Sequence, residues 1–402
     1  MRVLIADKLS AHVAPPPETN GCAVTSQPAL KGESRTEALR SLDPHVLVVR
    51  STKVRAEQLA EADSLSLIIR AGAGTNTIDV ARASARGVYV ANCPGKNAIA
   101  VAELTFGHLL NLDRRISDNV QALREGRWAK KEFSRSRGVH GRTMALLGCG
   151  RIGPEVIARA HAFGMSVRAW SRSLTPERAA ALGVDFAATP HEACRGADVL
   201  SVHLALTEET RGLVDRSLLE ALTPGAFVIN TSRGGVVDQD ALLLAIENRG
   251  IKAGLDVFAQ EPGAGDDTFS FPIGQEAAVY GTHHIGASTG QATLAVGDEV
   301  VRVVDTYLRQ GTVINCVNLA EDTAASHLLV GRHADEVGVL ARVLDHLRQD
   351  GVNVQEMDNH IFKGGGAACA RIHISGAPSA SVIDRIGEDA KVFAASLVSL
   401  EP

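Results

Sequence analysis

Three stretches in the middle of this sequence each run from an apolar, strand-like segment into one charged or titratable side chain. AFVINTSRGG leads to Arg233, KAGLDVFAQEP leads to Glu261, and AVYGTHHIGAS leads to His284. Open α/β sheets keep their ligands outside the carboxyl ends of their strands. A guanidinium binds carboxylates, and an imidazole beside a carboxylate transfers protons. Each residue alone has a structural alternative, but the three in this order indicate a proton-relay site.

A glycine-rich turn upstream indicates which kind of ligand binds beside this site. TMALLGCGRIGPEVIARAHAFGM contains an apolar strand, a turn with Gly148, Gly150 and Gly153 in G-x-G-x-x-G spacing, and an amphipathic helix. The first glycine allows a tight turn, the second lets a pyrophosphate approach the backbone, and the third lets helix and strand pack closely. Free amides at the helix start then bind the anion. The segment predicts a dinucleotide site, and a sharp turn without a ligand is the alternative.

Composition excludes several classes of protein. The 402 residues suffice for two or three domains. A net charge of −5 argues against nucleic-acid binding. No apolar run approaches the roughly 20 residues of a membrane span, and the first residues do not resemble a signal peptide. The six cysteines lack metal-binding or redox spacing, so we expect reduced thiols, a cytoplasmic location and no metal site.

The order of elements predicts an α/β protein with two doubly wound, parallel-sheet, Rossmann-like domains and a small C-terminal domain. Residues 1–93 alternate short apolar strands with helical segments, and a helix in 286–318 is expected to return to them. Residues 94–285 begin with a long helical stretch from about Asn97 to Glu125 and continue as the dinucleotide-binding domain. Residues 326–402 read strand, helix, strand, strand, helix, strand, which is the pattern of a ferredoxin-like α+β domain.

These motifs together resemble the D-isomer-specific 2-hydroxyacid dehydrogenase family, and the tail resembles an ACT domain. This combination resembles the members that act on 3-phosphoglycerate in serine biosynthesis, so the resemblance implies 3-phosphoglycerate and 3-phosphohydroxypyruvate as the substrate pair. The resemblance covers about the first 316 residues, and it rests on VVRSTKV, IIRAGAGTNTIDVARASARGVYVANCPGKNAIAVAEL, GRWAK, LLGCGRIG, HLALTEETRGLVD, INTSRGGVVDQDAL, AGLDVFAQEP and HHIGAST.

The resemblance implies a role for each candidate residue. His284 exchanges a proton with the substrate hydroxyl while a hydride moves between C2 and a nicotinamide, Glu261 holds the imidazole, and Arg233 orients the substrate carboxylate. Ala73 and Gly74 in RAGAGTN place backbone amides at an anion. Arg50 faces the far, phosphate-bearing end of the substrate, whereas Lys53 is a solvated lysine.

The cofactor residues depart from the usual pattern. A Rossmann site for NAD carries an acidic residue about twenty positions after the glycines, but here SVRAW is followed by Ser171 and Arg172. Without a carboxylate to repel a 2′-phosphate, the cofactor is NAD or NADP with a preference for NADP. In the alternative, Arg172 stacks on the adenine or points to solvent. The remaining residues assigned to cofactor binding are Arg151, Ile152, His203, Thr231 and Asp256.

Other departures concern the catalytic loop and the tail. His283 replaces a proline ahead of His284, and Ala205 replaces another proline. In the tail, Asp335 and Glu336 follow His333 where the family pattern has an amide and an arginine, so serine control is not carried over to the predicted effector site.

The expected partners are a small 2-hydroxy or 2-keto acid, a small-molecule effector at the tail, and a second copy or three further copies of the chain. We expect neither nucleic acid nor a membrane. Two alternative functions remain: a glyoxylate or hydroxypyruvate reductase, and a dinucleotide-sensing binding protein with the same fold.

Overall fold

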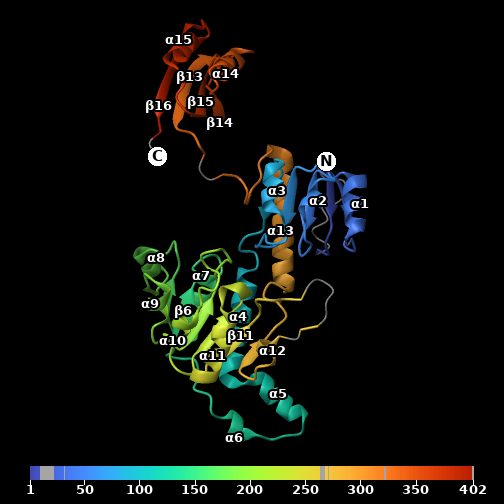
Figure 1. Ribbon diagram of the computed structural model, residues 1–402, viewed down its shortest axis with the longest axis vertical. Coiled ribbons are helices and arrows are strands. Elements are labelled where there is room, and N and C mark those ends of the chain that lie inside the picture. The colour runs from blue at the N-terminus through green and yellow to red at the C-terminus, as the bar shows by residue number, and fades with distance from the viewer. Residues whose placement is uncertain (10–21, 31, 263–267, 270, 321–322, 401–402) are drawn as a thin grey trace. The chain divides into compact units, whose positions relative to one another are not determined.

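The computed structural model describes residues 1–9, 22–30, 32–262, 268–269, 271–320 and 323–400. The chain separates into two compact units, Met1–Asn318 and Leu319–Pro402. The first unit contains two parallel sheets, and the second contains one antiparallel sheet (Figure 1). No helix in the described ranges has both the length and the apolar character needed to cross a membrane.

The smaller parallel sheet of the first unit has the strand order β2-β1-β3-β4-β5. Helices α1, α2 and α3 cover one face, and α13, which comes from much later in the chain, packs on the other. Strand β2 was not predicted, because AVTS is short and mostly half-exposed. The bounds are β1 (Arg2–Ile5), β2 (Ala23–Ser26), α1 (Glu33–Leu42), β3 (Val46–Val49), α2 (Ala56–Leu59), β4 (Leu67–Arg70), α3 (Val80–Ala85), β5 (Tyr89–Asn92) and α13 (Gly290–Gln310).

The larger parallel sheet has the strand order β12-β11-β10-β9-β6-β7-β8. β6 is the first strand of this sheet along the chain, β7 and β8 follow on one side of it, and β9 to β12 follow on the other. The strand order therefore reverses between β6 and β9, and ligands bind at such a point in folds of this kind. Helices α4 and α7 cover one face, and α9, α10 and α11 cover the other. The strands are β6 (Thr143–Leu147), β7 (Ser166–Trp170), β8 (Asp185–Phe186), β9 (Val199–Val202), β10 (Phe227–Asn230), β11 (Lys252–Leu255) and β12 (Val279–Gly281).

The predicted helical stretch from about Asn97 to Glu125 consists of two helices. Helix α4 ends at Arg114, Arg115 adopts a left-handed φ of 50°, and α5 begins at Ile116. Helices α5 and α6 extend away from the larger sheet (Figure 1). The helices of this region are α4 (Ala98–Arg114), α5 (Ile116–Arg124), α6 (Lys130–Phe133), α7 (Gly153–Ala162), α8 (Pro176–Ala181), α9 (Pro190–Cys194), α10 (Arg216–Glu220), η2 (Gly234–Val236), α11 (Gln239–Arg249) and α12 (Pro272–Gln275).

The second unit has the predicted order of strand, helix, strand, strand, helix, strand. Its antiparallel sheet has the order β14-β15-β13-β16, and two helices cover one face. This is the arrangement of a split βαβ fold. The elements are β13 (His327–Ala334), α14 (Val339–Gln349), β14 (Asn353–Ile361), β15 (Ala367–Ser375), α15 (Ala380–Glu388) and β16 (Val392–Ser399).

Candidate active site

The three predicted proton-relay residues follow three adjacent strands of the larger sheet. β10, β11 and β12 lie side by side in parallel register, and Arg233, Glu261 and His284 come after their carboxyl ends. The structure places Nδ1 of His284 2.8 Å from Oε2 of Glu261. Arg233 is close enough for its charge to act on Glu261. The sequence pattern therefore located residues that the fold brings together.

The Glu261 carboxylate is a permanent acceptor for His284. Its Oε1 accepts a hydrogen bond from the Phe258 backbone N–H at 3.1 Å. Burial favours a higher pKa for Glu261, but the contacts with His284, the Phe258 amide and the charge of Arg233 together hold the pKa below its usual range. An ionised Glu261 accepts a hydrogen bond from the Nδ1–H of His284, which leaves Nε2 to face a reactant. No described residue hydrogen-bonds that nitrogen.

The backbone of His284 is strained, and a buried aspartate holds it. His284 has a φ of +53°, which a side chain with a Cβ rarely adopts. Asp256, 1% exposed, accepts hydrogen bonds on Oδ1 from the Thr282 hydroxyl at 2.6 Å and the Ile285 N–H at 2.8 Å. Its Oδ2 accepts from the Gly286 N–H at 2.8 Å. Asp256 thus anchors the turn that presents His284, and its assignment to cofactor binding stays a prediction.

Arg233 reaches from the larger sheet to the glycine loop that follows β4. Its Nη1 donates to the Ser232 carbonyl at 2.6 Å, and a Cβ added to Gly74 would lie only 2.3 Å from its Nη2. Burial lowers the pKa of this guanidinium, although the Glu261 carboxylate opposes the shift. A half-buried cation packed against a bare glycine can meet a small anion bound by both segments.

The loop around Ala73 and Gly74 has the properties predicted for an anion nest. The Ala73 carbonyl accepts from the Asn92 side chain at 2.6 Å, and the Gly72 carbonyl accepts from the Cys93 N–H at 2.9 Å. The backbone N–H groups of Ala73 and Gly74 have no partner among the described residues. The loop is therefore fixed by its carbonyls and leaves these N–H groups free for an anion.

Arg70 is a site residue that the sequence analysis missed. Its Nη1 would lie 1.5 Å from a Cβ at Gly72, so the guanidinium lies directly on the loop. Burial lowers the pKa of Arg70, and the nearby positive charges of Arg233 and Arg50 lower it further. Arg70 ends a buried strand, as the strand-end reasoning requires, so that signal was present in LIIR.

Arg50 lies in a turn that Asp7 fixes. Oδ2 of Asp7 accepts the backbone N–H groups of Arg50 at 2.6 Å, Ser51 at 3.1 Å and Thr52 at 3.0 Å. The half-buried Arg50 side chain is near enough to Arg70 to influence its pKa, whereas Lys53 is exposed. Arg70 and Arg233 therefore lie on the glycine loop, and Arg50 is close enough to Arg70 to form a cluster of three guanidiniums with them.

The glycine turn between β6 and α7 has the three properties expected of a pyrophosphate cradle. Gly148 has a φ of +104°, and a Cβ there would lie 2.3 Å from the His203 carbonyl oxygen. A Cβ at Gly150 would meet nothing within 4 Å, so the backbone is open to a ligand. A Cβ at Gly153 would lie 2.8 Å from the Gly148 carbonyl oxygen, which explains the close packing of helix and strand.

The other predicted cofactor residues surround this turn or lie beneath it. Ser171 and the exposed Arg172 follow β7 beside the turn, because the Gly148 N–H donates to the Trp170 carbonyl at 2.8 Å. Exposed Arg151 packs its stem near Gly95, and Ile152 is half-buried at the start of α7.

His203 and Thr231 are buried polar residues of the same region. Burial lowers the pKa of His203 to about 3, so its imidazole is neutral. Its Nε2 pairs with the Ser201 hydroxyl at 2.8 Å, and its buried Nδ1 has no partner among the described residues. The Thr231 hydroxyl lies 3.1 Å from that of Thr105. The open backbone at Gly150 and the unpaired Nδ1 of His203 both fit a bound polar group.

His283 is exposed and makes no hydrogen bond with a described residue, so it is a neighbour of His284 rather than its partner. A hollow of about 580 Å³ lies beside Glu261, His283 and His284, and Phe258 and Phe269 form part of its wall.

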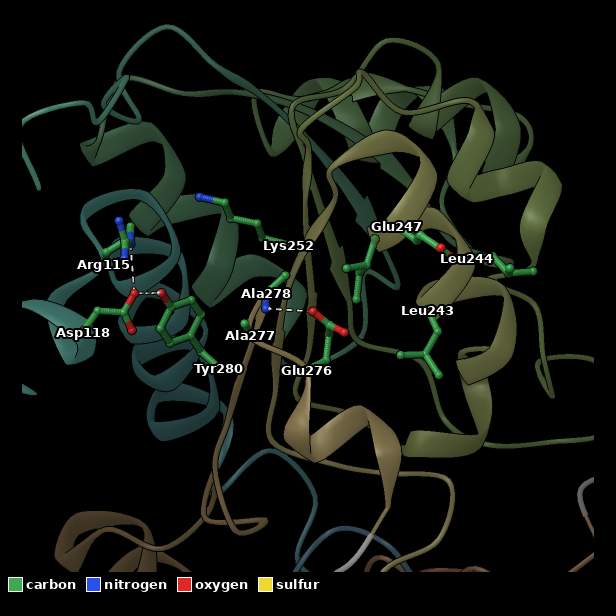
Figure 2. A pocket seen from close by; sticks show the side chains of 11 residues that line it. Arg115, Asp118, Leu243, Leu244, Glu247, Lys252, Glu276, Ala277, Ala278 and Tyr280 are labelled. Atoms are coloured by element: carbon green, nitrogen blue, oxygen red, sulfur yellow. Dashed lines mark hydrogen bonds and ion pairs between the residues drawn. The ribbon is translucent and has the colours of Figure 1, made fainter. Parts of the chain in front are cut away.

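A larger hollow of about 940 Å³ shares no lining residue with the hollow at His284. Figure 2 shows it between α5, α11 and β12. The Tyr280 hydroxyl donates to Asp118 at 2.7 Å, and Nε of Arg115 donates to the same oxygen at 2.9 Å. These bonds attach α5 to the larger sheet.

The chain is similar to proteins of one family along most of its length. Residues 106–286 match the family described as D-isomer specific 2-hydroxyacid dehydrogenase, NAD binding domain. The chain is 36% identical over 291 residues to D-3-phosphoglycerate dehydrogenase of Methanocaldococcus jannaschii, covering 72% of this chain and 54% of that protein. It is 38% identical over 353 residues to the enzyme of the same name from Mycobacterium tuberculosis, covering 85% and 63%.

Solved structures agree with these sequence matches. The chain superposes with a TM-score of 0.68 and 28% identity on an NADPH-dependent glyoxylate/hydroxypyruvate reductase from Sinorhizobium meliloti, covering 79% of this chain and 97% of that one. The chain spans a little over half of the first of the curated relatives and less than two thirds of the second. Together with the geometry of Arg233, Glu261, His284 and the glycine turn, these matches show that residues 106–286 belong to the NAD-binding domain of the D-isomer-specific 2-hydroxyacid dehydrogenase family.

Proposed function

We propose that this protein is an NAD(P)-dependent oxidoreductase that transfers a hydride between a nicotinamide dinucleotide and C2 of a small D-2-hydroxy acid. Its proposed substrate pair is 3-phosphoglycerate and 3-phosphohydroxypyruvate. The observation that carries the proposal is the His284–Glu261 pair, joined at 2.8 Å, beside an Arg233 guanidinium that packs on the glycine loop. This arrangement places a proton donor and a guanidinium that binds carboxylates at one site.

The side chains have complementary roles in reduction of the keto acid. Arg233 and the free N–H groups of Ala73 and Gly74 hold the substrate carboxylate, which fixes the position of C2. The reduced nicotinamide, when bound, supplies the hydride that C2 accepts. His284 gives the proton on Nε2 to the carbonyl oxygen, while Glu261 holds Nδ1 and stabilises the positive charge of the protonated ring. The reverse reaction returns the proton to Nε2.

The guanidinium cluster supports a substrate with two anionic groups. Arg233 and Arg70 lie on one loop and Arg50 adds its charge to that of Arg70, so the mutual repulsion of the three cations favours binding of an anion. A carboxylate alone occupies one guanidinium, whereas a phosphate at the other end of a three-carbon acid engages the remaining cations. Glyoxylate and hydroxypyruvate, which lack the phosphate, remain the second candidate substrates.

The dinucleotide site consists of the glycine turn and the residues around it. Gly148, Gly150 and Gly153, with Arg151 and Ile152, would hold the pyrophosphate at the start of α7. Ser171 and Arg172 would bind the adenosine ribose, and the lack of a carboxylate there favours NADP. His203 and Thr231 complete the assigned set, together with Asp256.

Absorbance of the reduced cofactor tests the function directly. NADPH or NADH is mixed with the protein and with 3-phosphohydroxypyruvate, hydroxypyruvate, glyoxylate and pyruvate in turn. Loss of absorbance is expected and should be fastest with the phosphorylated acid. Confirmed cofactor binding without turnover of any acid in the panel would support the dinucleotide-sensing alternative. His284→Ala should abolish turnover and leave the cofactor Kd within about twofold, because Glu261 is the only described residue to which this imidazole is hydrogen-bonded.

We also propose how the chain is divided. Residues 1–93, completed by 286–318, form the substrate domain, 94–285 the dinucleotide domain and 326–402 an ACT-like regulatory domain. The split βαβ arrangement supports the last assignment. His333 is buried there, with Nε2 3.2 Å from the Asn359 side chain, while Asp335 is exposed and Glu336 pairs with Lys391 at 2.7 Å. This acidic turn disfavours a carboxylate effector such as serine, which calorimetry with serine would measure.

The proposed assembly is a homodimer or a homotetramer in the cytoplasm. Four large apolar side chains on α5 and the turn after it are exposed: Ile116 at 48%, Val120 at 40%, Leu123 at 53% and Trp128 at 82%. Such a surface is typical of a contact between copies. Light scattering after size-exclusion chromatography measures the oligomeric state. The six unpaired cysteines are consistent with a reducing compartment.

A further inference from the structure

The backbone turn that presents His284 is attached to helix α4 by a side chain outside the predicted site. His108, on α4, has Nε2 3.1 Å from the Thr282 hydroxyl. Thr282 lies two residues before His284, and its hydroxyl also bonds Asp256 at 2.6 Å. A continuous chain of hydrogen bonds therefore runs from α4 through Thr282 and Asp256 to the amides that follow His284.

The direction of each hydrogen bond in this chain is fixed. The Asp256 carboxylate only accepts, so the Thr282 hydroxyl uses its one proton toward Asp256. The Thr282 oxygen must then accept from His108, which places a proton on Nε2. Burial lowers the pKa of His108, although the Asp256 charge opposes the shift, and a neutral ring with one N–H suffices for this bond.

The position of the His108 ring is built into the fold. The side chain is 4% exposed on α4, where the helix contacts β11. A Cβ at Gly254, which lies on β11, would be 2.7 Å from Cβ of His108 and 3.1 Å from its Nδ1. Only glycine at 254 leaves this space, so helix and strand approach closely enough for His108 to reach Thr282.

We propose that His108 is a positioning residue for the acid-base histidine, because it donates from Nε2 to Thr282 and so fixes the Asp256-anchored turn that holds His284. The proposal rests on the proposed function, since it assigns His284 the proton transfer. His108 contacts neither His284 nor Glu261 through a hydrogen bond. Its effect is to hold a residue with a left-handed φ in the orientation that its chemistry requires.

The test compares substitutions that keep or remove the Nε2 donor. H108Q keeps an N–H at the position of Nε2, H108N moves it to the position of Nδ1, and H108L removes it while filling the space. We expect kcat for the best 2-keto acid to fall about ten- to hundredfold in H108L and H108N, with the KM and the cofactor Kd within about twofold. H108Q should recover most of the rate.

L112A is the matched control, because it removes buried volume from the same helix and leaves the His108–Thr282 hydrogen bond in place. It should lower thermal stability and keep kcat. A wild-type kcat in H108L would overturn the proposal. An equal loss of kcat in H108Q and H108L would also overturn it, because the donor would then be irrelevant.

Amide hydrogen exchange gives a readout that needs no turnover. The N–H groups of Ile285 and Gly286 donate hydrogen bonds to Asp256. They should exchange about tenfold faster in H108L, while the exchange rates of the β11 amides stay unchanged. Unchanged exchange would contradict the positioning role. If the wild-type protein reduces no keto acid, the proposed function fails, yet exchange still decides what His108 does.

A second variant tests the chain of hydrogen bonds from its other end. T282V removes the hydroxyl that joins His108 to Asp256. If the bonds act as one unit, the H108L/T282V double variant should lose no more turn protection than the worse single variant. Additive losses would overturn the proposal. The T282V arm also decides the matter should H108L fail to fold.

Discussion

The contact between Gly74 and Arg233 predicts that one methyl group will damage substrate binding without unfolding the protein. Gly74 does not have a left-handed φ, so alanine adds no backbone strain there. Its Cβ would lie 2.3 Å from Nη2 of Arg233, and ordinary contact begins near 3.4 Å, so the guanidinium must move about 1.1 Å. A misplacement of about 1 Å costs on the order of a hundredfold in rate, or about 2.7 kcal/mol of transition-state binding.

Steady-state kinetics of Gly74→Ala measure this effect. We expect kcat/KM for the keto acid to fall about a hundredfold. Because only the flexible end of the Arg233 side chain must move, the melting temperature should stay within about 2 °C of that of the wild type. The cofactor Kd should also stay constant. Gly107→Ala is the matched control, because a Cβ there meets nothing within 4 Å on α4. An unchanged kcat/KM would refute the proposed position of Arg233, and parallel loss of cofactor binding would place the damage elsewhere.

Two further predictions concern the cofactor and the acid stability. Ser171→Asp should weaken NADP(H) binding by about tenfold or more and leave NAD(H) binding unchanged, because a carboxylate repels the 2′-phosphate. Fluorescence titration measures both affinities. If the wild-type protein binds NADP(H) more than about tenfold more weakly than NAD(H), the reasoning is contradicted. Hydrogen bonds from Arg302, Asn315 and Lys96 lower the pKa of Glu299 from 4.5 to about 2, so its contribution to stability is complete above pH 4.5 and is lost as the pH falls toward 2. Glu299→Gln should lower the free energy of unfolding at pH 7 by about 1 to 3 kcal/mol and reduce the loss of stability at acid pH. If the free energy of unfolding of the variant and the wild type depends on pH in the same way, this role of Glu299 is refuted.

Patterns that repeat along the chain could be predicted from the sequence. Apolar strands ending in Arg233, Glu261 and His284 share one local signature, and parallel pairing turns that signature into proximity. The glycine spacing predicted both the tight turn at Gly148 and the open backbone at Gly150. These inferences needed only the periodicity of strands and the conformational range of glycine.

Features that depend on contacts distant in sequence could not be predicted in this way. The break between α4 and α5 falls at Arg115, which is not a helix-breaking residue type, and its guanidinium pairs with Asp118 and Glu132. The three hydrogen bonds that the Asp256 carboxylate accepts from the His284 turn were not predicted, and its assignment to the cofactor stays a prediction. A buried carboxylate after a strand has the same sequence signature in both roles.

The distribution of charge around the glycine loop bears on the substrate more directly than the three proton-relay residues do. Arg70 comes from β4 of the smaller sheet and Arg233 follows β10 of the larger one, so segments of both sheets place a guanidinium on this loop. The pKa of Arg70 is lowered by burial and by its cationic neighbours, which means that these surroundings disfavour the charged form of Arg70. A ligand that brings more negative charge relieves more of this cost. Affinity should therefore rise from glyoxylate and hydroxypyruvate, with one anionic group each, to 3-phosphohydroxypyruvate with two, and a reversed order would mean that the three guanidiniums do not face the substrate.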